Sequence, residues 1–142
     1  MQQSSKNKMS DQVSSTYIYR VPVSQNDIDG LGHVNNIVYL RWVQEAAEAH
    51  WGVLSNDAVN QKYIWVVLRH EIDYHFPALL EDEIAVHTWV GKNDGARSER
   101  HTVLYNAAGK KLATALTTWC LLDASTKRPK RIDEEMMALF RQ

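Results

Sequence analysis

The sequence lacks several features that mark particular classes of protein. It has a single cysteine, Cys120, which excludes an intrachain disulfide, and the hydrophobic residues around it predict a buried, inert thiol. The formal net charge of −1 is too small to attract nucleic acid or a membrane surface. No apolar run reaches the roughly 18–20 residues of a membrane span, and the polar start has no signal-peptide core. We therefore expect a cytoplasmic protein with no nucleic-acid partner and no membrane span.

At 142 residues, the chain is long enough for one domain and short for two. Residues 1–13 are polar and offer almost nothing to bury, which predicts a disordered N-terminal arm. We expect residues 14–142 to form a single globular domain.

Hydrophobic patterns predict one long helix among five strands. Alternation typical of strands covers residues 16–23, 63–76, 83–91, 98–105 and 111–123. A loop rich in Asp, Asn and Gly precedes the helix, which begins at Asn35 or Asn36 and ends near Gly52. A short terminal helix is expected at 133–140. Consecutive hairpins favour an antiparallel sheet, and one helix covering its face gives a two-layer α+β domain.

The long helix is predicted to be amphipathic. A charged face carries Arg41, Glu45 and Glu48, which we interpret as exposed to solvent. The predicted apolar face consists of Ile37, Leu40, Val43, Ala47, Trp51 and Leu54. Because one helix covers only part of a sheet rich in Trp and Tyr, dimerisation would complete the burial.

The loop at residues 26–36 concentrates polar side chains directly before the helix. It holds two carboxylates, Asp27 and Asp29, and one imidazole, His33, beside free helix amides whose dipole favours negative charge. Such a setting keeps a carboxylate ionised and polarises a carbonyl, as acyl transfer requires. From these residues alone, a capped helix after an Asx-rich turn is the simpler interpretation. No metal site is predicted, because no further ligands lie at metal-binding spacing.

The run from Asp27 to Tyr39 resembles the signature of the 4-hydroxybenzoyl-CoA thioesterase-like family, and also a segment of plant acyl-ACP thioesterases. The order of elements from Thr16 to Phe140 is similar to that family as well. The resemblance implies the hotdog fold, an α+β fold in which a curved antiparallel five-stranded sheet wraps around one long central helix. It further implies homodimers, or homotetramers built as dimers of dimers, with thioester sites at the subunit interface.

The resemblance also implies roles for residues in and after the loop. Asp29 would be the catalytic carboxylate, which attacks the thioester carbonyl or activates water. The amide of Asn36 would polarise that carbonyl, and His33 would orient water or substrate. Tyr39 would line the acyl pocket.

Other residues are predicted to contact the substrate away from the reacting carbon. Gly32 would let the backbone approach a ligand closely, with Asn35 beside it at the helix start. Arg97 and Arg100 are candidates for the phosphates of coenzyme A at the mouth of the site, with exposed surface charge as the alternative for each. Coenzyme A is part of the substrate, so no cofactor is expected.

The predicted function is hydrolysis of an acyl-CoA to a free acid and coenzyme A. The sequence departs from the plant enzymes, which have Asn where Leu31 stands, and from the benzoyl-type enzymes, which are apolar at the position of His33. A different hotdog branch uses a helix carboxylate, for which Glu45 and Glu48 are available. An acyl-ACP thioesterase and a non-catalytic acyl-thioester binding protein are the alternative functions.

Overall fold

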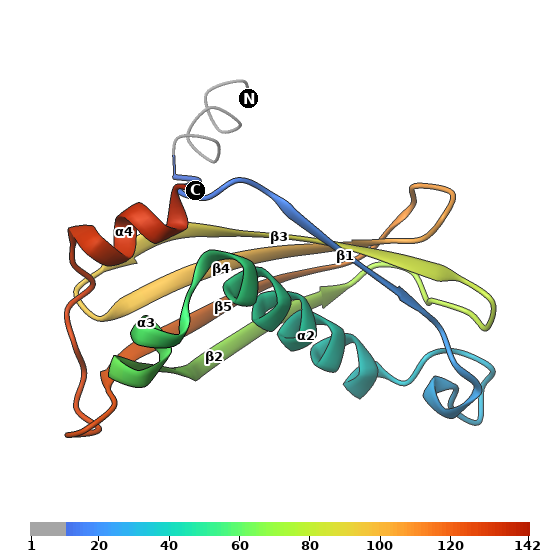
Figure 1. Ribbon diagram of the computed structural model, residues 1–142. Coiled ribbons are helices and arrows are strands. Elements are labelled where there is room, and N and C mark those ends of the chain that lie inside the picture. The colour runs from blue at the N-terminus through green and yellow to red at the C-terminus, as the bar shows by residue number, and fades with distance from the viewer. Residues whose placement is uncertain (1–10) are drawn as a thin grey trace.

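The computed structural model describes residues 11–142, so most of the predicted arm lies outside the described residues. Five strands form one antiparallel sheet in the order β1-β3-β4-β5-β2, and α2 lies across one face of it (Figure 1). This arrangement confirms the predicted α+β architecture. In chain order the elements are β1 (Tyr17–Pro22), η1 (Gln25–Asp27), α2 (Asn36–Leu54), α3 (Asp57–Lys62), β2 (Tyr63–Tyr74), β3 (Glu83–Asp94), β4 (Arg97–Tyr105), β5 (Lys111–Asp123) and α4 (Glu134–Phe140).

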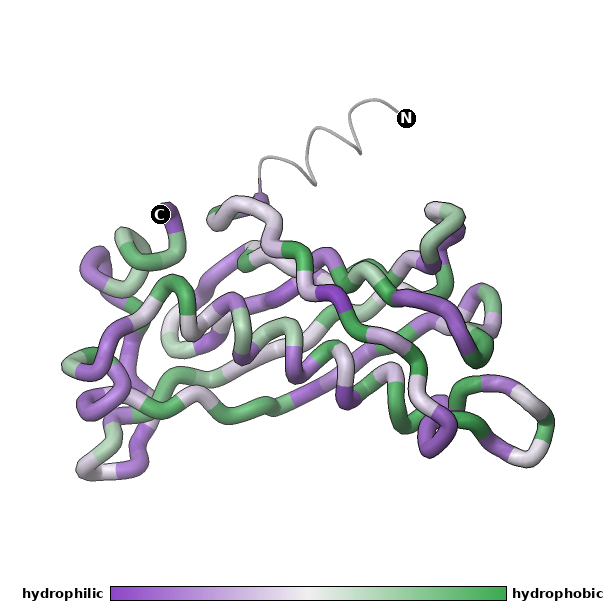
Figure 2. Tube along the Cα trace, turned by 45° about the vertical axis from the view of Figure 1, so that its right-hand side comes forward, coloured by the Kyte–Doolittle hydropathy of each residue, from purple (hydrophilic) through white to green (hydrophobic). Residues whose placement is uncertain are grey.

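Strands β1 and β2 form the two edges of the sheet. Pro22, which cannot donate a ladder hydrogen bond, is the last residue of the edge strand β1. Strand β2 pairs with β5 along its whole length, and its first half is hydrophobic (Figure 2). A register shift between Val67 and Arg69 marks a bulge, so the uninterrupted alternation predicted for residues 63–76 is wrong there. The outer edge of β2 has no partner strand within residues 11–142.

Helix α2 starts where the sequence predicts, because the Asn35 side chain caps it by accepting a hydrogen bond from the Ile37 N–H. The helix passes Gly52 and ends at Leu54 instead. The predicted apolar face is wrong at the first turn, since Ile37 is 74% exposed. Tyr39 and Trp42 are buried in its place, and burying these aromatic rings removes more apolar surface from water than burying one isoleucine would.

Helix α3 is an element that the hydrophobic pattern did not predict. It spans only six residues, too few to show a helical period. Its local signal is a cap: the Asn56 side chain accepts a hydrogen bond from the Val59 N–H at 3.0 Å. The other short helix, α4, begins as predicted, with Asp133 capping the Met136 N–H.

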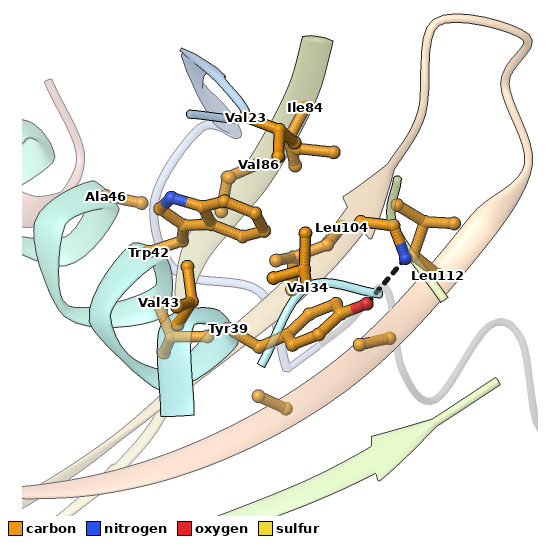
Figure 3. Close-up of a cluster of buried hydrophobic side chains, with 14 residues drawn as sticks. Val23, Val34, Tyr39, Trp42, Val43, Ala46, Ile84, Val86, Leu104 and Leu112 are labelled. Atoms are coloured by element: carbon orange, nitrogen blue, oxygen red, sulfur yellow. Dashed lines mark hydrogen bonds between the residues drawn. The ribbon is translucent and has the colours of Figure 1, made fainter. Parts of the chain in front are cut away.

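Between the sheet and the helices lie two apolar clusters. The first contains Trp42, Tyr39 and Ile84 and lies under the N-terminal half of α2 (Figure 3). The second contains Leu54 and Phe140 and lies towards α4. Val13, at the end of the predicted arm, packs against the second cluster and donates its N–H to the Val90 carbonyl at 2.8 Å.

Buried polar side chains lie between these two clusters. On β3, Thr88 follows Ile84 and Val86 of the first cluster and precedes Val90 of the second. We call the buried polar side chains at this level the polar band: Thr88, Arg100, Thr102, Thr117 and, from α2, His50. The free thiol of Cys120 is buried, as predicted.

Candidate active site

The loop before α2 is built from hydrogen bonds between its own residues. The Ser24 N–H donates to Asp27 Oδ2 at 2.9 Å, which closes a capping box around the short helix η1. A bridge between Ile28 and Val34 then brings the two sides of the loop together. Residues 29–33 therefore form a separate small turn next to the first turn of α2.

Asp29 organises this turn. Its Oδ1 accepts hydrogen bonds from the Leu31 N–H at 2.8 Å and the His33 N–H at 3.2 Å, while its own N–H donates to the His33 carbonyl at 2.7 Å. Gly32 adopts φ of +81°, a conformation that favours glycine. The Asp29 side chain is half-buried, and its Oδ2 makes no hydrogen bond within the described part of the chain. One carboxylate oxygen is thus held in the turn, and the other is available to a ligand.

The neighbouring carboxylate, Asp27, has a different environment. It is buried, and Oδ1 accepts a hydrogen bond from Arg41 Nη2 at 3.0 Å. Burial raises the pKa of Asp27, but the hydrogen bonds from Ser24 and Arg41 outweigh this effect, and the net pKa is below the usual value. Asp27 therefore fixes the loop to α2, as a bracing residue does.

The loop that contains Asp29 leads into α2, whose first turn has backbone donors. Asn35 accepts hydrogen bonds from the Ile37 N–H through Oδ1 and from the Val38 N–H through its carbonyl. The Asn36 N–H has no acceptor within residues 11–142, and the Asn36 carbonyl accepts a hydrogen bond from the Tyr74 hydroxyl at 3.2 Å. The free Asn36 N–H lies at the positive end of the helix dipole, where a developing negative charge is stabilised.

Tyr39 is a core residue rather than a surface residue. It is 2% exposed, and its hydroxyl oxygen accepts a hydrogen bond from the Ala78 N–H at 2.7 Å (Figure 3). Burial raises the pKa of Tyr39. The side chain connects α2 to the segment between β2 and β3, and this chain alone exposes almost none of it to an acyl group.

The remaining predicted residues divide between the loop and the far end of the sheet. His33, Gly32 and Asn35 are exposed beside Asp29. Arg97 lies opposite Asp94 at the end of β3 that is remote from the loop. The structure does not bring Arg97 or Arg100 to Asp29 within one chain.

Arg100 also departs from the expectation of a surface charge. It is 6% exposed and belongs to the polar band under α2. Alternation along β4 explains this position, because Arg100 lies on the same face as the core residues Thr102 and Leu104. The alternation in the sequence of β4 therefore indicates a buried arginine. It was overlooked because charged side chains were assumed to be exposed.

The helix carboxylates of the alternative mechanism lie apart from the loop turn. Glu45 accepts a hydrogen bond from the Tyr19 hydroxyl at 3.1 Å and pairs with Arg41 at 3.5 Å. Glu48 is exposed and lies in the wall of a cavity under the C-terminal half of α2. Neither this cavity nor a second one beside β1 and β3 contains a residue of the loop turn.

Residues 11–142 contain neither a membrane-spanning helix nor a cluster of metal-binding side chains. No helix there is long and apolar enough to cross a membrane. No three side chains of His, Cys, Asp or Glu in that range gather closely enough to hold a metal ion.

Most of the chain, including the loop before α2, matches a known protein family. Residues 23–140 match the thioesterase-like superfamily, and no curated protein matches the chain. A thioesterase from Thermus thermophilus, solved with coenzyme A and zinc, is 28% identical, with 87% of this chain and 90% of that one covered and a TM-score of 0.77. The probable thioesterase YbaW from Escherichia coli is 25% identical, with 86% and 94% covered and a TM-score of 0.75.

A 1,4-dihydroxy-2-naphthoyl-CoA thioesterase from Synechocystis is 20% identical, with 89% of this chain and 96% of that one covered and a TM-score of 0.76. At this identity the similarity concerns the fold. The superfamily match covers the Asp29 turn and the strands from β2 to β5. The chain therefore belongs to the thioesterase-like superfamily and has its hotdog fold.

Proposed function

We propose that this protein is an acyl-CoA thioesterase that uses Asp29 to hydrolyse acyl-CoA to a free acid and coenzyme A. The observation that carries the proposal is the Asp29 turn. It presents one free carboxylate oxygen in the loop that leads to the free Asn36 N–H at the start of α2, in a chain of the thioesterase-like superfamily. The coenzyme A bound to the similar Thermus thermophilus protein supports this ligand class.

Each group of the turn has a defined part in the reaction. Asp29 Oδ2 either attacks the thioester carbon, giving a mixed anhydride that water then hydrolyses, or removes a proton from a water that attacks this carbon directly. In both routes the carbon–sulfur bond breaks, and coenzyme A leaves as a thiolate that takes a proton from water. The Asn36 N–H donates to the carbonyl oxygen as negative charge develops on it. Exposed His33 lies where it can orient water or the substrate. The reaction takes place in the cytoplasm and needs no cofactor, since coenzyme A arrives with the substrate.

A second copy of the chain completes the site. The outer edge of β2 has no partner strand among the described residues. Large hydrophobic side chains are exposed in the loop, at the helix start and along β2, namely Leu31, Ile37, Leu68 and Tyr74. Exposed strand edges and apolar patches of this kind pair with another chain. In the proposed homodimer, which can pair again into a tetramer, the second subunit provides the walls for the acyl group that one chain lacks around Asp29.

Thiol release from a panel of aliphatic and aromatic acyl-CoA substrates tests the activity. The wild type is expected to turn over at least one of them, and Asp29→Asn to reduce kcat/KM by roughly 10²–10⁴-fold. Asp94→Asn, the same exchange at an exposed carboxylate far from the loop, is the matched control and keeps the rate. Chelation of metal ions is expected to leave the rate unchanged.

Three results would contradict the proposal. If no substrate of the panel released thiol, the protein would not be an acyl-CoA thioesterase. If Asp29→Asn kept full activity, Asp29 would not be the catalytic carboxylate. Faster turnover of the same acyl group on an acyl carrier protein would assign the protein to that carrier instead.

The oligomer is tested by sedimentation of Leu68→Lys. Leu68 is half-exposed at the β2 edge, so a lysine there can reach solvent and the single chain should keep its fold. We expect the wild type to sediment as a dimer or larger, and Leu68→Lys to become monomeric and inactive. Val53→Lys, which changes an exposed apolar residue of α2, is the control and stays oligomeric. A fully active monomer of Leu68→Lys would show that one chain suffices.

A further inference from the structure

A cavity of about 260 Å³ lies under the C-terminal half of α2, away from the Asp29 turn. Residues of helices α2, α3 and α4 and of strands β2 to β5 line it, and it is partly open to solvent. Ala47, the lining residue of α2 nearest the loop, follows Asn36 by eleven positions, which corresponds to roughly 17 Å along the helix. The cavity is therefore separate from the proposed thioester site.

Arg100 is the charged side chain buried in the wall of this cavity. It projects from β4 into the polar band and is 6% exposed. Its Nη1 donates to His50 Nδ1 at 2.9 Å and to Thr88 Oγ1 at 3.2 Å. Burial lowers the pKa of Arg100 to about 10, so the guanidinium stays charged at neutral pH.

Neither partner of Arg100 neutralises its charge. Thr88 is uncharged, and burial together with nearby Arg100 lowers the pKa of His50 to about 4, so the imidazole is neutral. In the described part of the chain, the ion pairs between side chains do not include Arg100. A buried charge without a counterion carries a large desolvation penalty, which an anion in the cavity would offset.

The rest of the wall suits a flat apolar body. Trp51, Tyr63, Trp65, Trp119 and Phe140 provide aromatic surface. The indole N–H groups of Trp65 and Trp119 have no acceptor within residues 11–142. Glu48 is the one carboxylate of the lining, and it is exposed and forms no ion pair with Arg100.

The volume limits the size of the occupant. An apolar cavity of about 150 Å³ holds benzene, so this cavity has room for one aromatic ring with a carboxylate attached. We infer that the cavity is a second binding site, which takes a small aromatic monocarboxylate with its carboxylate on Arg100 and its ring between the tryptophans. The site does not depend on the proposed thioesterase activity.

Calorimetric titration of the full chain with benzoate, and with benzamide as its neutral analogue, tests this inference. We expect saturable binding of one benzoate per chain, with benzamide at least roughly tenfold weaker because it carries no negative charge to pair with the guanidinium. Tryptophan fluorescence should report the same titration, because three tryptophans lie in the wall.

Variants locate the binding. Arg100→Met replaces the buried charge by an apolar side chain of similar length and should abolish benzoate binding. Arg97→Met, an exposed arginine on the same strand, is the matched control and should bind benzoate within about twofold of wild type. Asp29→Asn should also bind benzoate normally, which separates this site from the thioester site.

Several outcomes would overturn the inference. Absence of saturable benzoate binding up to about 10 mM would show that the wild-type cavity does not take the acid. Equal affinity for benzoate and benzamide would show that the negative charge of the ligand does not contribute to binding. Undiminished binding to Arg100→Met, with its fold confirmed by circular dichroism, would place the ligand elsewhere.

Discussion

The charged groups near the two ends of α2 are held in different ways. At the N-terminal end, Asp29 is half-exposed and held by backbone N–H groups within four residues of it. Towards the C-terminal end, Arg100 is buried in a cavity wall, and its partners His50 and Thr88 come from different elements. The position of the Asp29 carboxylate is set by hydrogen bonds within its own loop, whereas the position of the Arg100 guanidinium is set by contacts between elements of the folded domain.

This difference determines where each end is sensitive to change. A carboxylate satisfied by a local turn keeps its geometry as long as the turn forms, and it has a free oxygen for chemistry. A guanidinium beneath a helix affects the stability of everything packed around it. Four measurements can test this contrast, from the largest expected effect to the smallest.

The largest effect is expected at His50, as a dependence of stability on pH. The native ring has a pKa of about 4, whereas the unfolded chain binds the proton near pH 6.5. The native state is therefore fully stable above pH 6.5 and loses about 3 kcal/mol as the pH falls to 4. Urea denaturation across this range should show that loss in wild type and a clearly smaller one in His50→Gln. Equal slopes would show that His50 is not held neutral.

The bracing carboxylate at the N-terminal end should contribute less. Asp27→Asn removes the charge that binds Arg41 and should cost about 2 kcal/mol of unfolding free energy at pH 7. The native pKa of Asp27 is lowered, so its contribution is present above the unfolded pKa of about 3.9 and is lost as the pH falls through the native pKa. The stabilities of wild type and variant should thus converge as the pH falls through the lowered native pKa of Asp27. Asp29→Asn, whose amide oxygen still accepts both N–H bonds, should be nearly as stable as wild type.

A smaller loss is expected where α2 meets the β2–β3 connection. Tyr39→Phe leaves the buried Ala78 N–H without its acceptor and should cost about 1.5 kcal/mol by thermal or urea unfolding. Tyr74→Phe is the matched control, because its hydroxyl contacts the Asn36 carbonyl at an exposed position. Its effect on stability should be below about 0.5 kcal/mol. Comparable losses in both variants would mean that burial of the hydroxyl is unimportant here.

The smallest effect concerns the turn itself. Gly32→Ala places a Cβ on a residue with φ of +81°, and should destabilise the fold by about 1 kcal/mol although the space around it is open. Gly30→Ala, in equally open space without positive φ, should be neutral. If the two alanine variants unfold alike, the left-handed conformation of Gly32 does not matter for stability.

The same difference between local and long-range contacts explains which features could be predicted from the sequence. The strands, the antiparallel order and the α2 start followed from alternation and from the Asn35 cap, which are local signals. The Asp29 turn was predictable for the same reason, because its partners Leu31 and His33 lie within the same loop. Helix α3 was missed since six residues are too few for a period, and the α2 face was misplaced because Ile37 and Tyr39 compete for burial.

By itself, the sequence determined the five strands, the capped start of α2 and the carboxylate in the loop before it, because each depends on residues close together in the chain. Only the tertiary structure decided that His50 and Thr88 contact Arg100 and that a cavity lies beside it. These facts depend on contacts between residues up to fifty positions apart. The pairing of strands and the rotation of α2 fix such contacts, and no local pattern encodes them.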